Sequence, residues 1–253
     1  MTIKYLDRMS WPDVQAAIQK GCKTVIVCFG SHEQHGRHLP LGTDAFFGDR
    51  IGEGLAKRFD AFLAPVFRVG CSQHHMGFPG TITLNSETFQ KIVQEATRCL
   101  ARHGFDNILL IPTHGGNFKP LEDAVANMEA IEGCKVMTFT DLDGFVERMY
   151  QSSARHGISR GAAGIHAGEW ETSLILALKP NLVKMEAART GYTGDLAEIK
   201  DRLFDGLHHI DKNGVLGDPT LARDGRGQAY LDDIVDYIAD HLRTYRFPSK
   251  CGT

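Results

Sequence analysis

The run TVIVCF, residues 24–29, carries no charged side chain, and the stretch GSHEQHGRHLPLGTD, residues 30–44, follows it directly. A short apolar run with β-branched residues predicts a buried strand. The stretch after it holds three histidines and two carboxylates in fifteen residues, and its glycines and proline disfavour a helix. The fold is therefore expected to present a polar, histidine-rich loop at the end of a strand.

Similar apolar runs recur along the chain and alternate with amphipathic segments. Strands are predicted at residues 24–30, 62–70, 107–117 and 135–141. Helices are predicted at residues 46–59, 86–104, 119–133, 168–180 and 227–247. Because strands and helices alternate, we predict an α/β fold with a mostly parallel sheet covered on both faces. Residues 186–226 have weak periodicity and are predicted to form loops or an excursion from the core.

Composition favours one domain spanning residues 1–253. The chain is 42% apolar, which is enough for one full core. A formal net charge of −3 argues against a nucleic-acid partner. The N-terminal residues lack a signal-peptide core, and no apolar stretch is long enough to cross a bilayer. We therefore expect a cytoplasmic protein with a small-molecule substrate and no membrane partner. Six cysteines without a CxxC pair indicate reduced, buried thiols.

The polar loop has the residue types of a metal site. Its HEQH segment is not the HExxH motif of zinc proteases, because the two histidines are one residue too close. In an extended backbone, Glu33 and His35 would point to one side, and His32 and Gln34 to the other. After a turn at the proline, Asp44 could join the first pair. Two carboxylates and an imidazole are a usual ligand set for Zn²⁺ or Mn²⁺, and one aspartate can bridge two ions.

Two further stretches are rich in the same residue types. PTHGGN, residues 112–117, places His114 at the end of a predicted strand, where sites of parallel sheets lie. HAGEWETS, residues 166–173, brings two carboxylates and a histidine to the start of a predicted buried helix. Buried carboxylates need a partner, which a metal or a proton-transfer role would supply. Other residues of these stretches are expected to have no direct role in the site. His38 is expected to face solvent, His32 and Gln34 to make structural hydrogen bonds, and Trp170 to be a core residue.

These three stretches, together with FPGTITL at residues 78–84, resemble the four motif regions of the creatininase (creatinine amidohydrolase) family, in the family's order. The resemblance covers about residues 20–180. It implies a three-layer α/β/α sandwich, two divalent metal ions per subunit (Zn, Mn or Fe) and a homo-oligomer, with a hexamer favoured. The metal ligands that it implies are Glu33 and His114 for the first ion, His35 for the second, and Asp44 as the bridge. His166 matches the proton-transfer histidine. Ser72 and His75, near the site by analogy, are substrate-binding candidates.

The chain departs from creatininase at two places. Creatininase has a tyrosine and then a glutamate after the histidine of the third motif, and that glutamate binds the second metal; here Gly115 and Gly116 stand there. The aromatic residue before the fourth motif is also absent, since RGAAGIH at residues 160–166 offers only small side chains in its place. Creatinine is therefore not the expected substrate.

The missing glutamate leaves the second metal short of a ligand, and the HAGEWETS stretch, residues 166–173, is expected to supply a carboxylate in its place. Helical geometry favours Glu169, because it lies i+3 from His166. The family motif favours Glu171. We follow the motif, because the HAGE segment need not be helical.

The expected reaction is metal-assisted hydrolysis. Bound ions would lower the pKa of water from about 15.7 toward about 7, and the resulting hydroxide would attack a carbonyl carbon. His166 would protonate the leaving group. The leading substrate class is a small cyclic amide or a formamide, and the alternative reaction is ring opening of a carbocyclic dicarbonyl of the oxidised-inositol type. The alternative from another class is a non-catalytic metal- or small-molecule-binding protein. The loss of the second-metal glutamate favours that alternative, whereas His166 and Glu171 speak against it.

Overall fold

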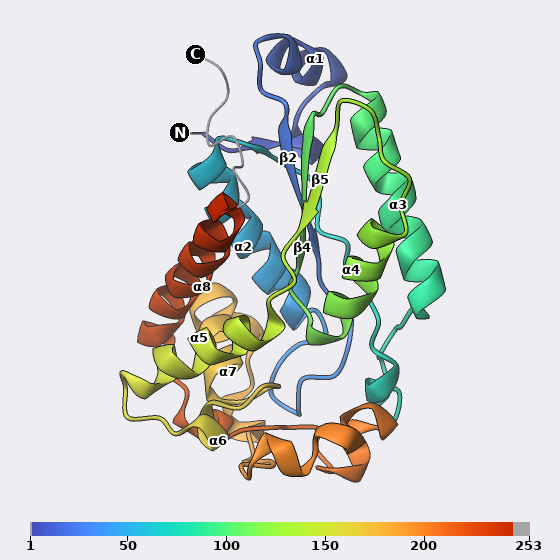
Figure 1. Cartoon of the computed structure of the whole chain (residues 1–253). Coiled ribbons are helices and arrows are strands. Elements are labelled where there is room, and N and C mark those ends of the chain that lie inside the picture. The colour runs from blue at the N-terminus through green and yellow to red at the C-terminus, as the bar shows by residue number, and fades with distance from the viewer. Residues whose placement is uncertain (1, 245–253) are drawn as a thin grey trace.

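The computed structural model describes residues 2–244, and a parallel sheet lies at its centre (Figure 1). Five strands pair in parallel in the order β1-β3-β2-β4-β5. The strands are β1 Lys4–Tyr5, β2 Thr24–Phe29, β3 Phe62–Leu63, β4 Asn107–Pro112 and β5 Lys135–Thr138. Since β2 and β4 pair along their whole length, from Thr24 opposite Asn107 to Phe29 opposite Pro112, their carboxyl ends lie side by side.

Helices cover both faces of this sheet (Figure 1). They are α1 Trp11–Gln19, α2 Thr43–Phe59, α3 Ser86–Arg102, α4 Phe118–Ala126, α5 Leu142–Ala154, α6 Arg160–Ala163, α7 Glu169–Leu178 and α8 Asp224–Thr244. Side-chain caps begin three of them: Asn85 accepts a hydrogen bond from the Thr88 amide at α3, Asp141 one from the Gly144 amide at α5, and Ser159 one from the Ala162 amide at α6.

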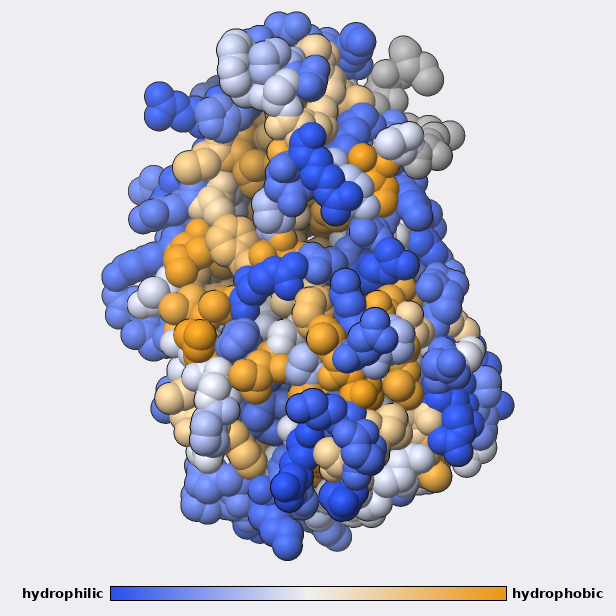
Figure 2. All heavy atoms as spheres, turned by 180° about the vertical axis from the view of Figure 1, so that it is seen from behind, coloured by the Kyte–Doolittle hydropathy of each residue, from blue (hydrophilic) through white to orange (hydrophobic). Residues whose placement is uncertain are grey.

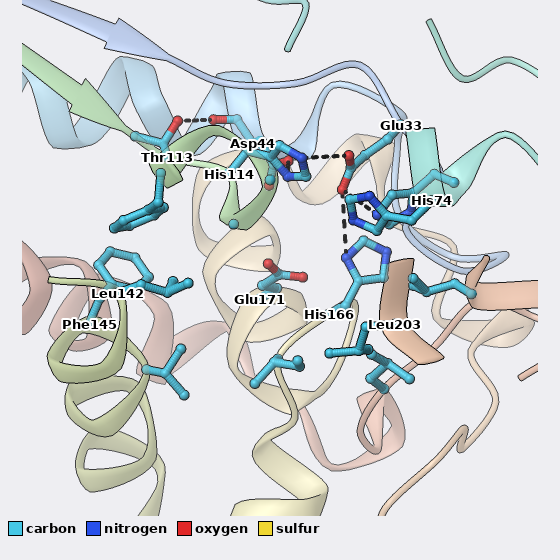
Figure 3. A pocket seen from close by; sticks show the side chains of 18 of the residues that line it. Glu33, Asp44, His74, Thr113, His114, Leu142, Phe145, His166, Glu171 and Leu203 are labelled. Carbon is cyan, nitrogen blue, oxygen red and sulfur yellow. Dashed lines mark hydrogen bonds and ion pairs between the residues drawn. The ribbon is translucent and has the colours of Figure 1, made fainter. Parts of the chain in front are cut away.

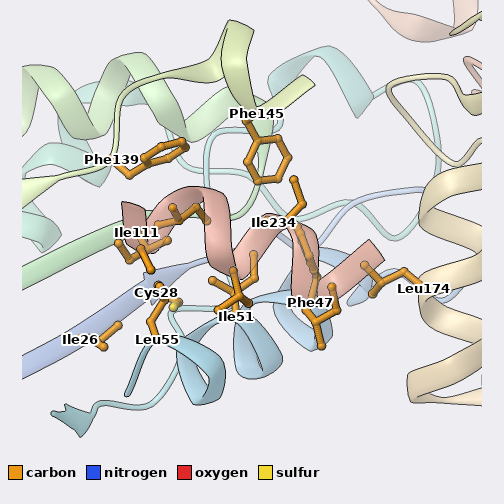
Figure 4. Packing of buried hydrophobic residues seen from close by; sticks show 14 of the residues in the cluster. Ile26, Cys28, Phe47, Ile51, Leu55, Ile111, Phe139, Phe145, Leu174 and Ile234 are labelled. Atoms are coloured by element: carbon orange, nitrogen blue, oxygen red, sulfur yellow. The ribbon is translucent and has the colours of Figure 1, made fainter. Parts of the chain in front are cut away.

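Alternation along β2 separates the core into two layers. Val25 and Val27 face one layer with residues of α3 and α4, whereas Ile26 and Cys28 face the other with residues of α2 and α8. Figure 4 shows the second layer, where Ile51 of α2 and Ile234 of α8 pack near the strand residues. The predicted α/β/α sandwich with a parallel sheet is therefore confirmed.

Several predicted bounds differ from those observed. The run at 62–70 pairs regularly only at Phe62–Leu63, because Pro65 lacks the N–H that a strand ladder needs. The run at 107–117 leaves the sheet at Pro112. The helix predicted at 119–133 ends at Ala126, with Asn127 as its C-cap. Strand β1 and helices α1 and α5 were not predicted. The end of the 227–247 prediction lies outside the described residues.

Residues 186–226 form the predicted excursion. Up to the start of α8 they contain short 3-10 turns instead of long helices. The turns are η5 Met185–Ala187, which begins one residue before this segment, η6 Leu196–Glu198, η7 Lys200–Asp205, η8 Leu207–His209 and η9 Pro219–Leu221. This segment runs across the end of the molecule toward which the strands point (orange in Figure 1). Ile199 and Leu207 pack there with Leu216 in a small apolar cluster of their own.

The surface and the thiols add two observations. The face opposite that of Figure 1 mixes hydrophilic side chains with hydrophobic ones that gather across its middle (Figure 2). Among the helices within residues 2–244, none has the length and apolar character needed to cross a membrane.

The expectation of buried thiols holds for Cys22 and Cys28, but Cys99 is exposed on α3.

Candidate metal centre

Segments far apart in the sequence bring polar side chains together below the ends of β2 and β4 (Figure 3). Glu33 and His35 come from the loop after β2, and Asp44 lies in the first turn of α2. His114 follows β4 directly, at the N-terminal end of the short turn η3 Gly115–Asn117. His166 lies three residues before α7, and Glu171 lies in the first turn of that helix. Because the strands are parallel and adjacent, their following loops meet at one edge of the sheet, as predicted.

Asp44 lies between two histidines. Its Oδ1 is 3.3 Å from Nε2 of His35, and its Oδ2 is 3.1 Å from Nδ1 of His114. Ser31 donates a hydrogen bond of 2.5 Å to Oδ2 and fixes the carboxylate. A carboxylate that turns one oxygen toward each of two ligand nitrogens has the arrangement required to bridge two ions.

Main-chain carbonyl oxygens orient three of the histidine rings. The pairs are His35 Nδ1 with Glu33 at 3.2 Å, His114 Nε2 with Cys71 at 3.0 Å, and His166 Nε2 with Gln34 at 2.8 Å. Each ring therefore donates one N–H to the backbone and turns its other nitrogen toward the carboxylates. This second contact is what fixes the tautomer of metal-binding histidines.

Glu33 and His35 carry buried polar atoms that lack a hydrogen-bond partner among residues 2–244. These atoms are both carboxylate oxygens of Glu33 and Nε2 of His35. Nitrogens of His75 and His114 lie only 3.2 Å from the Glu33 oxygens, but they are not aimed to form hydrogen bonds. Burying a carboxylate without partners is costly. Short contacts without hydrogen-bond alignment are expected of atoms that converge on an ion, so a divalent metal fits this set.

Three overlapping groups of ligand atoms, each within 4.8 Å of one another, could hold an ion: Glu33 with His35 and Asp44, His35 with His166 and Glu171, and Glu33 with His75 and His166. The groups share members and form one continuous cluster. His114 stands outside all three, although its Nδ1 approaches Asp44 closely. We include His114 among the candidate ligands, because its hydrogen bond to the Cys71 carbonyl aims Nδ1 at the cluster.

Burial and mutual charge shift the pKa values of the cluster. Burial raises the pKa of Glu33 and of Glu171 to about 7. Burial acts to lower the pKa of His35, but the nearby Asp44 outweighs it and raises the pKa to about 10. His114 shows the same balance, with Glu33 and Asp44 raising its pKa to about 9 against the effect of burial. Protons thus occupy the metal-free cluster, and an ion would displace them.

Glu169 and Glu171 lie in separate environments. Helix α7 begins only at Glu169, and Ala167 has a positive φ of 51°, so His166 is not on the helix and the i+3 argument does not apply. Oε2 of Glu171 accepts a hydrogen bond of 2.5 Å from the Ala167 amide and lies 3.9 Å from Nε2 of His35. The carboxylate of Glu169 points away from the cluster. Its hydrogen-bond donors are Ser153, Ser173, Arg226 and Tyr230.

Residues around the cluster have mixed outcomes. Gln34 is the structural hydrogen-bonder expected, since its amide nitrogen donates to the Gly214 carbonyl at 3.0 Å and lies 3.0 Å from His75 Nδ1. The expectation that His38 faces solvent is wrong: the side chain is buried, and its Nε2 pairs with Thr172 Oγ1 at 2.9 Å, because the loop folds beneath α7. Trp170 is buried as predicted.

The two substrate-binding candidates are placed differently. His75 lines the cavity beside the cluster. Ser72 is fully buried, and its Oγ lies 3.5 Å from Nε2 of His114. It is not among the described residues that line the cavity. A substrate role for either residue stays a prediction. His74 also lines the cavity, and its ring stacks on that of His114 with centroids 5.9 Å apart.

The two glycines after His114 are not equivalent. A Cβ at Gly116 would come within 2.2 Å of the Cys71 carbonyl oxygen and 2.6 Å of Nε2 of His114. This backbone therefore has no room for the glutamate of the creatininase pattern. A Cβ at Gly115 would meet nothing within 4 Å, and this residue lies on the cavity wall.

Comparison with known proteins identifies relatives of the chain. The family model described as Creatininase, creatinine amidohydrolase, matches residues 7–242. A mycofactocin precursor peptide peptidase of Mycolicibacterium smegmatis is 31% identical over 90% of this chain and 87% of the relative. The creatinine amidohydrolase of Pseudomonas putida is 27% identical over 94% and 96% of the two chains. The 3-dehydro-scyllo-inosose hydrolase of Thermotoga maritima is 26% identical over 97% and 85%.

Solved structures share the fold. A tryptophan-to-phenylalanine mutant of creatininase, type II, matches with a TM-score of 0.79 at 24% identity, covering 96% of this chain and 99% of that chain. A structure described as creatininase Mn matches with a TM-score of 0.77 at 23% identity, over 96% and 99% of the two chains.

Proposed function

The chain belongs to the creatininase family, whose members are hydrolases, and from that premise we propose that it is a divalent-metal-dependent hydrolase of a C–N amide bond. The observation that carries the proposal is the buried cluster around Glu33 and Asp44, with unpaired ligand atoms at the edge of a cavity. Cyclic amides and formamides are the leading substrate classes. Short peptides join them, because the 31% identical relative is named a peptidase.

We assign the proposed ligands to two ions that share Asp44. Glu33 and His114 would hold the first ion, and His35 and Glu171 the second. The imidazole and carboxylate set suits Zn²⁺, Mn²⁺ or Fe²⁺. When bound, such ions polarise a carbonyl oxygen and make deprotonated water available near neutral pH.

His166 is the proposed proton carrier. Its Nδ1 lies 3.8 Å from the Glu33 carboxylate, and the Gln34 carbonyl holds its other nitrogen. Burial and the positive charge of His35 keep its pKa well below the usual range, so the free ring is neutral and can accept a proton. The proton would come from the attacking water and would pass to the leaving nitrogen as the C–N bond breaks.

Two alternatives remain distinct from amide hydrolysis. Ring opening of a cyclic dicarbonyl would need His166 to protonate an enolate carbon, and the relative named 3-dehydro-scyllo-inosose hydrolase supports testing it. A non-catalytic binding protein would hold metal but turn over neither class of substrate.

The test is a turnover screen on protein with measured metal content. Purified chain loaded with Zn²⁺ or Mn²⁺ is offered cyclic amides, formamides, short peptides and cyclic diketones. We expect hydrolysis of an amide, and we expect His166→Gln to keep its metal while losing at least about 100-fold in kcat. Full turnover by His166→Gln would contradict the assigned role, and turnover of diketones alone would favour ring opening.

A further inference from the structure

The cavity beside the proposed metal centre has two unlike sides (Figure 3). Figure 3 shows Glu33, His74 and His166 on one side of Glu171, with Leu142 and Phe145 on the other. We call the second side the apolar chamber. Its walls come from α4, α5 and α7: Phe118, Leu142, Phe145, Val146, Met149 and Trp170.

The walls of the apolar chamber are part of the rigid core. Phe145 of α5 packs edge-to-face against Phe118 at 6.0 Å and Trp170 at 6.4 Å, and Trp170 packs against Phe47 at 5.4 Å. All four rings are buried. The chamber is therefore formed before any ligand arrives, and a preformed apolar cavity favours an apolar ligand.

Polar partners are scarce on this side. The polar side chains that line the cavity, within the part of the chain described, are those of the metal cluster, His74 and His75, Thr113 and Trp170. The Thr113 hydroxyl already donates to the Asp44 carbonyl at 3.0 Å, which leaves the indole N–H of Trp170, a buried donor without a partner among residues 2–244. A ligand with several hydroxyl groups in the chamber would lose water and find one donor at most, which is unfavourable.

The available space suits one side chain. The whole cavity, metal side included, measures about 190 Å³. A cavity of about 150 Å³ accepts benzene, so the apolar chamber holds at most one such group. Gly115 keeps part of this space open, because its missing Cβ faces nothing within 4 Å. On the metal side, the cavity is also lined by Phe204, which is 73% exposed and packs edge-to-face on His74 with ring centroids 5.3 Å apart.

We propose that the apolar chamber binds an aromatic or branched aliphatic side chain of the substrate, next to the amide bond that is cleaved. Gly115 sets the size of that side chain. This inference rests on the proposed hydrolase function. It makes apolar acyl or amino-acid amides the substrate class, and it excludes polyhydroxylated rings.

Hydroxamates of three kinds test the inference without turnover, because the hydroxamate group chelates a metal and the attached group then probes the chamber. Zinc-loaded protein of measured zinc content is titrated calorimetrically with acetohydroxamate, phenylacetohydroxamate and gluconohydroxamate. We expect phenylacetohydroxamate to bind at least about tenfold more tightly than acetohydroxamate, because a buried ring leaves water. Gluconohydroxamate should gain nothing over acetohydroxamate. Equal affinity of all three, or tightest binding of gluconohydroxamate, would overturn the inference.

Substitutions that fill the apolar chamber test whether the phenyl group binds there. Gly115→Phe and Val146→Phe fill the chamber from opposite walls and should reduce the phenyl preference to within about twofold, with zinc content unchanged. Gly115→Ala is the matched control and should keep the preference. A preference that survives in both filled variants at full zinc content would place the ring elsewhere and refute the proposal. A phenyl preference without any amide turnover would instead refute the hydrolase function and leave the chamber intact.

Discussion

Helix α7 carries a buried carboxylate at Glu169 and a partly buried one at Glu171, and their surroundings differ completely. Glu169 receives hydrogen bonds from four side chains of this chain, including the guanidinium of Arg226 at 2.9 Å. Glu171, two residues on, faces Asp44 and His35 in a cluster where both oxygens of Glu33 lack a partner. The first acid is satisfied by the fold alone. The second belongs to a group that the fold leaves incomplete, and this difference separates a structural network from a metal centre.

Removing the shared carboxylate should have the largest effect. We expect Asp44→Ala to lose both ions, because no other carboxylate among residues 2–244 turns one oxygen toward each of His35 and His114. Elemental analysis of the purified variant should find little metal, while His35→Ala should chiefly lose the second ion. Full metal content in Asp44→Ala would show that the cluster is not the metal centre.

Replacing each of the two acids of α7 by glutamine, in separate variants, tests whether their roles differ. Glu171→Gln should weaken second-metal affinity at least about tenfold and change the stability of the metal-free protein little. Glu169→Gln should leave metal affinity unchanged and lower the free energy of unfolding by about 2 kcal/mol, since it breaks the charged bond with Arg226. Metal titration and denaturant unfolding of both variants give the answer. If Glu169→Gln loses the metal and Glu171→Gln keeps it, the two roles are reversed.

The pH dependence of stability should mark the incomplete region. In the metal-free protein the pKa of His35 is about 10 and that of His114 about 9, both above the unfolded value of about 6.5. The folded state then holds these protons more tightly, so their contribution to stability is complete below pH 6.5 and is lost as pH rises through 9 to 10.

We expect the melting temperature of metal-free protein to fall by several degrees between pH 6.5 and 9.5. Zinc-loaded protein should show a smaller fall, because the ion has already displaced the protons. Thermal scans at constant ionic strength measure both. A flat or rising profile for the metal-free protein would mean that the histidines are not held charged.

The smallest effect should come from the contact between the polar loop and α7. Thr172→Val removes the hydroxyl that pairs with His38 and should lower the free energy of unfolding by about 1 kcal/mol. Metal content should not change, because neither residue contributes an atom to the cluster. Loss of metal in this variant would give the His38 contact a larger part in positioning the loop than its energy indicates.

The parallel sheet and the convergence of Glu33, His35, Asp44 and His114 were predictable from the sequence. They depend on local signals, namely apolar runs that end in polar residues, and on the rule that parallel strands deliver such residues to one edge. The choice of Glu171 follows the family motif; its Oε2 lies 3.9 Å from Nε2 of His35, and its role as a metal ligand stays a prediction.

Other features depend on packing between distant segments, which no local pattern records. The burial of His38 requires α7 to lie over the loop, and the network of Glu169 joins residues up to 61 positions apart. Helix α5 supplies much of the apolar chamber, although its sequence carries no motif of the site. Strand β3 is shorter than the run at 62–70 predicts, because Pro65 cannot donate a hydrogen bond to the neighbouring strand.

The three carbonyl contacts that orient His35, His114 and His166 come from the main chain, not from side chains. No substitution at Glu33, Gln34 or Cys71 can delete a carbonyl oxygen, so point mutation cannot directly remove the groups that choose the tautomers. A lineage with this backbone is free to vary the residues around its cavity, and with them its substrate, while the ring orientations are inherited with the fold.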